Sequence, residues 1–330
     1  RRRVTDEQGL SAVGRGVAAL TGSKSLLRGL VRGAGMLAPL VFKHIPTTSG
    51  LRLRFAPAVL RERTLPPIPA RNLFDRVPEH SMAAAGRPTI GLFAGCAITY
   101  LYPQVGEALV RLLTSFGYGL FLPRTQGCCG MPALSSGNGA LLTELAEANL
   151  AAFAEGGAET IVTACASCGG ALTGHYADLG EDGRGLADRI LDIHQFLDRE
   201  GLIARIAELP GQAERIRVTY HDPCHLRTRG ITREPRALLR ALPQVELVEM
   251  DEAASCCGLG GTFAATQAEL SRRIGDRKAA ALAASGAELV ATGCPGCVLQ
   301  LQDSIDRAGL RVRAVHTLDL VDQALYGGHA

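Results

Sequence analysis

All ten cysteines of this 330-residue chain fall into two copies of one pattern: a lone cysteine, a vicinal pair and then Cys-x-x-Cys. Thirty-one residues separate the lone cysteine from the pair in both copies. Corresponding cysteines lie 128 residues apart at the first three positions and 129 apart at the last two. The spacing predicts two similar structural units. The two sets are Cys96, Cys128, Cys129, Cys165 and Cys168, and then Cys224, Cys256, Cys257, Cys294 and Cys297.

Short apolar runs alternate with helical stretches in both copies, which indicates βαβ units and parallel sheets. The predicted strands are 89–94, 118–122 and 160–163 in the first copy and 217–220, 245–248, 288–291 and 312–315 in the second. The predicted helices are 105–115, 140–154 and 264–284. The predicted fold class is α/β, with two tandem Rossmann-like parallel-sheet domains after a basic extension that is mostly helical or irregular.

We predict an N-terminal extension at 1–84, a first domain at 85–210 and a second at 211–330. Residues 1–80 hold 14 Lys and Arg against 5 Asp and Glu, and the remaining residues hold 21 against 27. This basic arm either meets a negatively charged subunit or lipid surface or wraps its own domain. Residues 25–42 can form an amphipathic helix, for a membrane surface or for a neighbouring subunit or domain. The sequence contains no apolar run of about 18 residues, so no membrane span is predicted.

Matched sets of five thiols indicate metal ligands, and each cysteine group follows a predicted strand. Sites in open α/β sheets form beyond the carboxyl ends of the strands, so three loops per copy are expected to meet there. An iron–sulfur cluster needs several thiolates from separate loops, and a fifth predicts a less regular cluster or a bridging thiolate. Gly130 and Gly258, after the vicinal pairs, are expected to supply positive φ.

Three other interpretations compete with an iron–sulfur cluster. Zinc at one or both sites would leave a fifth cysteine unused. A disulfide framework would require a secretory signal, and none follows the three N-terminal arginines. A thioredoxin-like motif at one Cys-x-x-Cys would ignore most of the cysteines. Free thiols without a signal indicate a reducing compartment.

At these residues the sequence resembles the cysteine-rich, or CCG-domain, iron–sulfur proteins, a family that includes one of the subunits of heterodisulfide reductase. The resemblance covers about residues 88–326, and QGCCGMPALSSG, YHDPCHL, CCGLGGTF and TGCPGC are most similar to the glycolate oxidase and lactate-utilisation group. It implies one four-iron cluster per set, non-cubane as in the heterodisulfide reductase branch, with all ten cysteines as ligands. Some relatives bind zinc at one site, so zinc at one site is an alternative.

The resemblance implies an electron-transfer subunit of a flavin-dependent glycolate or lactate dehydrogenase or oxidase. Its partner would be an FAD-containing subunit that oxidises the 2-hydroxy acid, and electrons would pass toward a quinone-type acceptor. Larger family members carry a ferredoxin-like region, and no such cysteine run precedes Cys96, so that region is expected to be cut away or on a separate polypeptide. The alternatives are a catalytic heterodisulfide or thiol–disulfide reductase and a zinc-stabilised assembly module. The predicted location is cytoplasmic, with peripheral contact to the inner face of the cell membrane as a further expectation, and no nucleic-acid partner is predicted.

The two copies differ around the lone cysteine. His221, Asp222 and His225 surround Cys224, whereas the positions 128 residues earlier hold Phe93, Ala94 and Ala97. Histidine titrates near neutral pH, so the second site is hypothesised to couple electron flow to protons or to lie nearer the terminal acceptor. The alternative is that the two histidines hydrogen-bond cluster sulfurs or backbone. His175, His194 and His316 are expected to be surface or capping residues.

Overall fold

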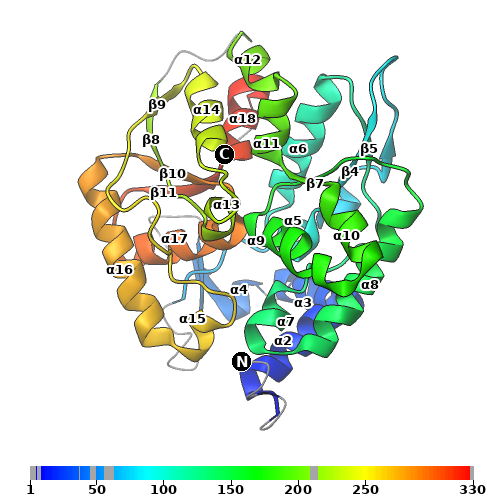
Figure 1. Ribbon diagram of the computed structural model, residues 1–330. Coiled ribbons are helices and arrows are strands. Elements are labelled where there is room, and N and C mark those ends of the chain that lie inside the picture. The colour runs from blue at the N-terminus through cyan, green and yellow to red at the C-terminus, as the bar shows by residue number, and fades with distance from the viewer. Residues whose placement is uncertain are drawn as a thin grey trace.

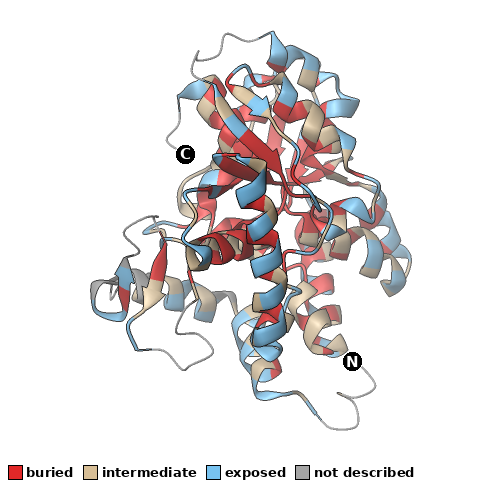
Figure 2. Ribbon diagram, turned by 90° about the vertical axis from the view of Figure 1, so that its left-hand side faces the viewer, coloured by how far each residue is buried: buried red, intermediate tan, exposed pale blue. Residues whose placement is uncertain are grey.

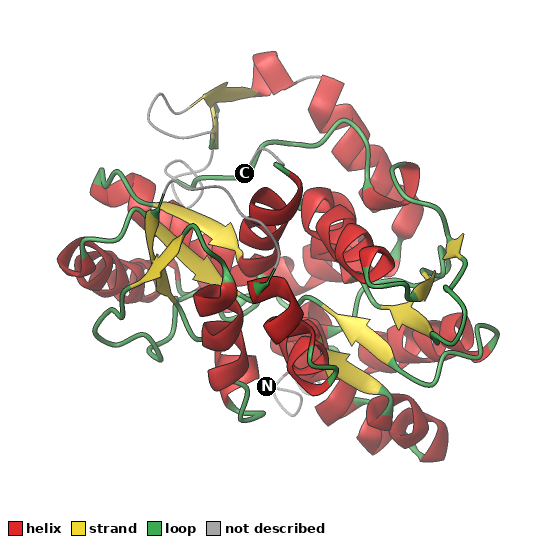
Figure 3. Cartoon of the chain, turned by 90° about the horizontal axis from the view of Figure 1, so that it is seen from above, coloured by secondary structure: helices red, strands yellow, loops and turns green. Residues whose placement is uncertain are grey.

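The chain folds around two β-sheets set side by side, with helices around and between them (Figure 1, Figure 3). The computed structural model describes residues 5, 9–36, 38–44, 50–55, 63–208 and 215–327. Each sheet contains the strands of one copy of the cysteine pattern, and a mostly helical region precedes the first sheet. The predicted α/β class with two parallel sheets is therefore confirmed.

The first sheet has the order β3-β5-β4-β6-β7. Its strands are β3 (His80–Ser81), β4 (Thr89–Leu92), β5 (Gly119–Phe121), β6 (Ile161–Thr163) and β7 (Ile190–Asp192). The last four are parallel to one another, and β3 is antiparallel on the edge. Short apolar strands such as IVT in β6 are fully buried, as expected for strands covered by helices on both faces.

The second sheet has the order β9-β8-β10-β11 and is parallel throughout. Its strands are β8 (Ile216–Tyr220), β9 (Val245–Leu247), β10 (Leu289–Thr292) and β11 (Arg313–His316). Among the parallel strands, each half therefore places the first in chain order between the second and the third, with the fourth beyond the third. Buried residues gather in these strands and on the helix faces that cover them (Figure 2).

Helices flank the strands of both halves. The first half contains α5 (Gly95–Tyr100), α6 (Pro103–Ser115), α7 (Met131–Ser136), α8 (Gly139–Ala154), α9 (Ala166–Gly170), α10 (Glu181–Asp188), α11 (Ile193–Arg199) and α12 (Leu202–Ala207). The second contains α13 (Cys224–Arg227), α14 (Arg233–Ala241), α15 (Phe263–Thr266), α16 (Ala268–Ser285), α17 (Pro295–Ala308) and α18 (Thr317–Tyr326). A π-helical turn, Ala171–His175, continues α9.

Contacts between the halves are reciprocal. Helix α11 of the first half packs on α14 of the second, and α18 of the second packs on α6 of the first. Arg111 of α6 forms a bidentate ion pair with Asp322 of α18, with both N···O distances 2.7 Å. The CysxxCys helix α9 also packs against α13 of the second half. The two cysteine-bearing faces consequently lie toward each other.

The N-terminal region contains α2 (Ala12–Gly22), α3 (Lys24–Met36), α4 (Ala38–Val41) and a hairpin of β1 (Phe42–His44) and β2 (Leu51–Leu53). Helix α2 packs on α7 and α8 of the first half, and Arg28 of α3 pairs with Asp75 at 2.9 Å. Contact with its own domain is therefore present, while Leu26 and Leu30 of α3 remain exposed. Among the described residues no helix is long and apolar enough to cross a membrane.

Two predicted helices differ from the structure, and strand β7 was missed. The helix expected at 25–42 corresponds to α3 and α4, which lie on either side of residue 37, a position outside the described residues, and its last residue, Phe42, lies in strand β1. The helix expected at 264–284 is interrupted at Gln267, whose non-helical backbone angles (φ −131°, ψ 52°) separate α15 from α16. Strand β7 was not predicted, because three residues ending in a polar aspartate give too short an apolar run.

Candidate metal centre

The first five cysteines come from loops that follow three neighbouring parallel strands. Cys96 lies in α5 directly after β4, Cys128 and Cys129 lie in the loop after β5, and Cys165 and Cys168 open α9 after β6. Because β5, β4 and β6 are adjacent and parallel, their carboxyl ends share one edge of the sheet. The predicted convergence of the three loops is confirmed for this half.

Their sulfur atoms form a continuous group. The Sγ atoms of Cys96 and Cys128 are 3.7 Å apart. The Cys129 thiol interacts with those of Cys128 and Cys168, and Cys168 interacts in turn with Cys165. Four of the five side chains are buried and Cys96 is partly buried.

The second set repeats this placement after β8, β9 and β10. The Sγ atoms of Cys257 and Cys297 are 3.7 Å apart, and each cysteine also interacts with a further thiol, that of Cys256 or Cys294. Cys224 lies within electrostatic range of Cys257 and Cys294. In this set Cys224 and Cys256 are exposed, so the second site is more open to solvent than the first.

The glycine after each vicinal pair has the predicted left-handed backbone, with φ of 85° at Gly130 and 97° at Gly258. A Cβ at Gly130 would collide with the Leu142 side chain, and one at Gly258 would lie 2.8 Å from the Ser271 carbonyl oxygen. The Gly258 N–H also donates to Cys256 Sγ at 3.3 Å. These glycines let two adjacent cysteines turn toward one cavity.

Each Cys-x-x-Cys opens a helix. Cys165 is the N-cap residue of α9 and Cys294 that of α17, and the second cysteine of each motif lies in the first helical turn. Pro295 is the first residue of α17, a position that suits proline because its N–H has no intrahelical partner. The N-terminus of a helix favours negative charge and therefore thiolate.

Close packing of buried thiols moves their pKa values in opposite directions. Hydrogen bonds from Cys128 and Cys168 lower the pKa of Cys129 to about 5. Bonds to Cys129 and Cys165, together with burial, raise the pKa of Cys168. The pKa of Cys257 is lowered by its own neighbours in the same way. Five thiolates held close together require a cation to offset their charge, so each donor set fits a polynuclear metal centre.

The two sets meet, which sequence reasoning did not predict. The Cys165 thiol interacts with that of Cys294, and Ser167 Oγ lies 3.4 Å from Cys294 Sγ. The Ala166 N–H donates to the carbonyl oxygen of Gly293 at 3.1 Å. The inner edges of the two sites are therefore in direct contact.

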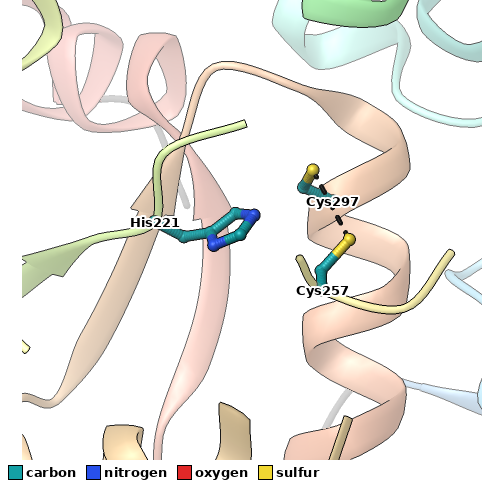
Figure 4. A group of neighbouring side chains, drawn as sticks. All are labelled: His221, Cys257 and Cys297. Carbon is teal, nitrogen blue, oxygen red and sulfur yellow. Dashed lines mark hydrogen bonds between the residues drawn. The ribbon is translucent and has the colours of Figure 1, made fainter. Parts of the chain in front are cut away.

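His221 lies beside the second set, as Figure 4 shows. A ring nitrogen of His221 and the Sγ atoms of Cys257 and Cys297 all lie within 4.8 Å of one another. His225 Nδ1 lies 3.6 Å from Cys224 Sγ. Asp222 is instead bound by the Arg236 guanidinium through both carboxylate oxygens, at 2.7 and 2.8 Å.

Sequence reasoning also missed a buried polar network between the halves. His194 Nδ1 lies 2.6 Å from Asp192 Oδ1, and its Nε2 lies 2.8 Å from Thr317 Oγ1. His316 Nε2 donates to the carbonyl oxygen of Ala164 at 2.9 Å. Both histidines are buried, so surface exposure is wrong for them, although His316 does cap α18. The available signal was their position at the carboxyl ends of strands, His194 just after β7 and His316 as the last residue of β11.

Fold and site together define a duplicated α/β protein with two cysteine-lined centres. The model of the cysteine-rich (CCG) domain matches residues 90–173 and 218–302, and the chain belongs to this family. It is 37% identical to a fumarate reductase (CoM/CoB) subunit of Methanothermobacter marburgensis over 71% of this chain and 46% of that protein. It is 34% identical to the probable glycolate oxidase iron–sulfur subunit of Bacillus subtilis, over 84% of this chain and 64% of that protein. It is 31% identical to lactate utilization protein A of Macrococcus caseolyticus, over 71% of this chain and 96% of that protein. The chain spans about half the length of the Methanothermobacter marburgensis protein.

Proposed function

We propose that the chain is an iron–sulfur subunit of an oxidoreductase complex, with one cluster in each half. The observation that carries this proposal is the convergence of three cysteine loops on one group of sulfurs in each half. The proposed ligands are Cys96, Cys128, Cys129, Cys165 and Cys168 in the first half and Cys224, Cys256, Cys257, Cys294 and Cys297 in the second. When bound, the clusters supply one-electron transfer.

The finer assignment is electron transfer from the oxidation of a 2-hydroxy acid. Its support is the similarity to a glycolate oxidase iron–sulfur subunit and to a lactate utilization protein. On this proposal an FAD-containing partner oxidises glycolate or lactate, and electrons cross this chain toward a quinone-type acceptor. The contact between Cys165 and Cys294 gives a short path between the two halves.

Two observations favour other candidates. Cys224 and Cys256 are exposed, so the sulfur of a disulfide substrate can reach the second site, as a thiol–disulfide reductase requires. His221, Cys257 and Cys297 offer the nitrogen and sulfur ligands that zinc prefers, which would make the second site structural.

Metal and sulfide analysis of the anaerobically purified chain separates these candidates. Two four-iron clusters predict about eight iron and about eight acid-labile sulfide per chain. Reduction of a low-molecular-weight disulfide by the isolated, iron-loaded chain would favour the reductase. Zinc without labile sulfide would refute the proposal and establish the zinc-stabilised module. Co-purification of the native complex then tests the flavoprotein partner, and its absence would remove the 2-hydroxy acid assignment.

A further inference from the structure

One of the three lysines of this chain is buried beside the second cysteine set. Lys278 of α16 is only 1% exposed. Its Nζ donates to the carbonyl oxygen of Glu252 at 2.6 Å and reaches that of Ala253 at 3.5 Å. These carbonyls belong to the loop that leads into Cys256, so the ammonium group lies at the edge of the second site.

No carboxylate forms an ion pair with this ammonium group within the described part of the chain. The carboxylate of Glu252 is bound by the neighbouring Arg277, and Lys278 uses only the Glu252 backbone oxygen. Burial lowers the pKa of Lys278, whereas the sulfur of Cys257, the Glu252 carboxylate and the sulfur of Cys297 raise it. The second cysteine set, together with the arginine-bound Glu252 carboxylate, therefore supplies the counter-charge that a buried lysine requires.

The first site has a neutral residue at the corresponding position. Asn149 lies 129 residues before Lys278 and is likewise buried, on helix α8. It accepts from the Gly127 N–H at 2.8 Å and donates to the Cys128 carbonyl and the Tyr176 hydroxyl, both at 2.9 Å. Both residues thus hold the loop of the vicinal pair, but only Lys278 brings a positive charge.

His221 is a second difference between the two sites, and it also favours added negative charge at the second site. The residue 128 positions earlier is Phe93, which cannot donate a hydrogen bond. In Figure 4 the His221 ring points toward the sulfurs of Cys257 and Cys297. Its Nδ1 is buried without a partner among the described residues. A buried N–H without an acceptor is rarer than a buried lone pair without a donor, which favours the tautomer with its proton on the other nitrogen.

We propose that Lys278 and His221 make the second site the more easily reduced of the two, so that electrons pass from the first site to the second. Each added electron increases the negative charge of a site, and a buried cation and an N–H donor toward sulfur stabilise that charge. One electron leaves the first site and enters the second, with no proton or bond transferred. It originates from a reduced flavin on the partner and leaves for an acceptor at the exposed Cys224 and Cys256.

This inference rests on the proposed function, and its test is a potentiometric titration of the iron-loaded full chain followed by electron paramagnetic resonance. Cys256→Ser identifies the signal of the second site. Lys278→Met is expected to lower the midpoint potential of that signal by at least a tenfold change in the reduction equilibrium, about 59 mV for one electron. His221→Phe is expected to lower the same midpoint. Arg277→Met is the matched control, because this neighbouring cation is 72% exposed and screened by solvent.

Lys278→Arg keeps the charge and is expected to retain the wild-type midpoint. If Lys278 only held the Glu252 loop in place, keeping the charge would not be enough to retain that midpoint. If Lys278→Met binds less iron, two other variants test the inference. Lys278→Asn places at the second site the residue that the first site has, and His221→Phe leaves the Glu252 loop intact. Unchanged midpoints in every iron-loaded variant, or equal shifts at both sites, would overturn this inference while leaving the proposed function standing. A wild-type chain without labile sulfide would instead remove the proposed function itself.

Discussion

Single residues decide whether the vicinal cysteines can share a cavity. Adjacent side chains normally diverge, and the left-handed glycine that follows each pair changes the direction of the chain. Sequence alone predicted this conformation, because a glycine in the same place in both copies has a clear physical reason. It could not predict that the Leu142 side chain fills the space where a Cβ at Gly130 would stand.

Gly130→Ala is therefore expected to destabilise the fold and to reduce iron binding at the first site. A left-handed non-glycine residue costs about 1–2 kcal/mol, and the collision with Leu142 adds to this. Gly185→Ala in α10 is the control, since its Cβ would meet nothing within 4 Å, and it is expected to be neutral or to stabilise by up to about 1 kcal/mol. Urea denaturation and iron analysis check both variants. Equal free energies of unfolding for the two would contradict the argument.

At the scale of elements, the strands were predictable where they are apolar and followed by cysteines. Strand β10 was expected at 288–291 and lies at Leu289–Thr292. The break at Gln267 was not predictable, because Ala-rich sequence on both sides favours one continuous helix. Helix α18 shows a second limit. Its N-cap, His316, has its Nε2 bonded to Ala164 of the other half, a contact that no local pattern encodes.

The N-terminus of α18 predicts a specific pH dependence of stability. Burial lowers the pKa of His316 to about 4 and raises that of Asp319, whose carboxylate accepts from the His316 N–H, to about 7. Between about pH 4 and 6.5 the unfolded chain protonates His316 and the folded chain does not, so this residue makes stability fall as the pH falls. Asp319 acts oppositely, because the folded chain keeps a proton that the unfolded chain releases near pH 4.

The two effects are expected to offset each other in the wild type, and Asp319→Asn should expose that of His316. The stability of the variant is predicted to fall by up to about 1.4 kcal/mol per pH unit as the pH decreases through this window. Urea denaturation at several pH values between about 4 and 7 measures the slope. A variant slope equal to that of the wild type would show that His316 does not resist protonation in the fold.

At the scale of the whole molecule, the two halves form one unit in which the two cysteine sites border each other. The duplicated pattern predicted two equivalent sites, and each half does bring its own loops together. How the halves face each other could not be predicted, because it depends on reciprocal packing of α11 on α14 and of α18 on α6. That packing brings Cys165 against Cys294, so one cysteine of each set borders both sites.

This contact predicts that some substitutions within one cysteine set affect both sites, whereas others affect only one. Cys165→Ser removes a thiol that interacts with Cys168 of its own set and with Cys294 of the other. We therefore expect it to change the electron paramagnetic resonance signals of both sites.

Cys96→Ser is the matched control, because its thiol contact, 3.7 Å to Cys128, lies within the first set. It should change the first signal alone. Iron and sulfide analysis of both variants shows how much of each cluster is retained. If Cys165→Ser disturbed only the first signal, as Cys96→Ser should, the two sites would be electronically separate despite the packing of the halves.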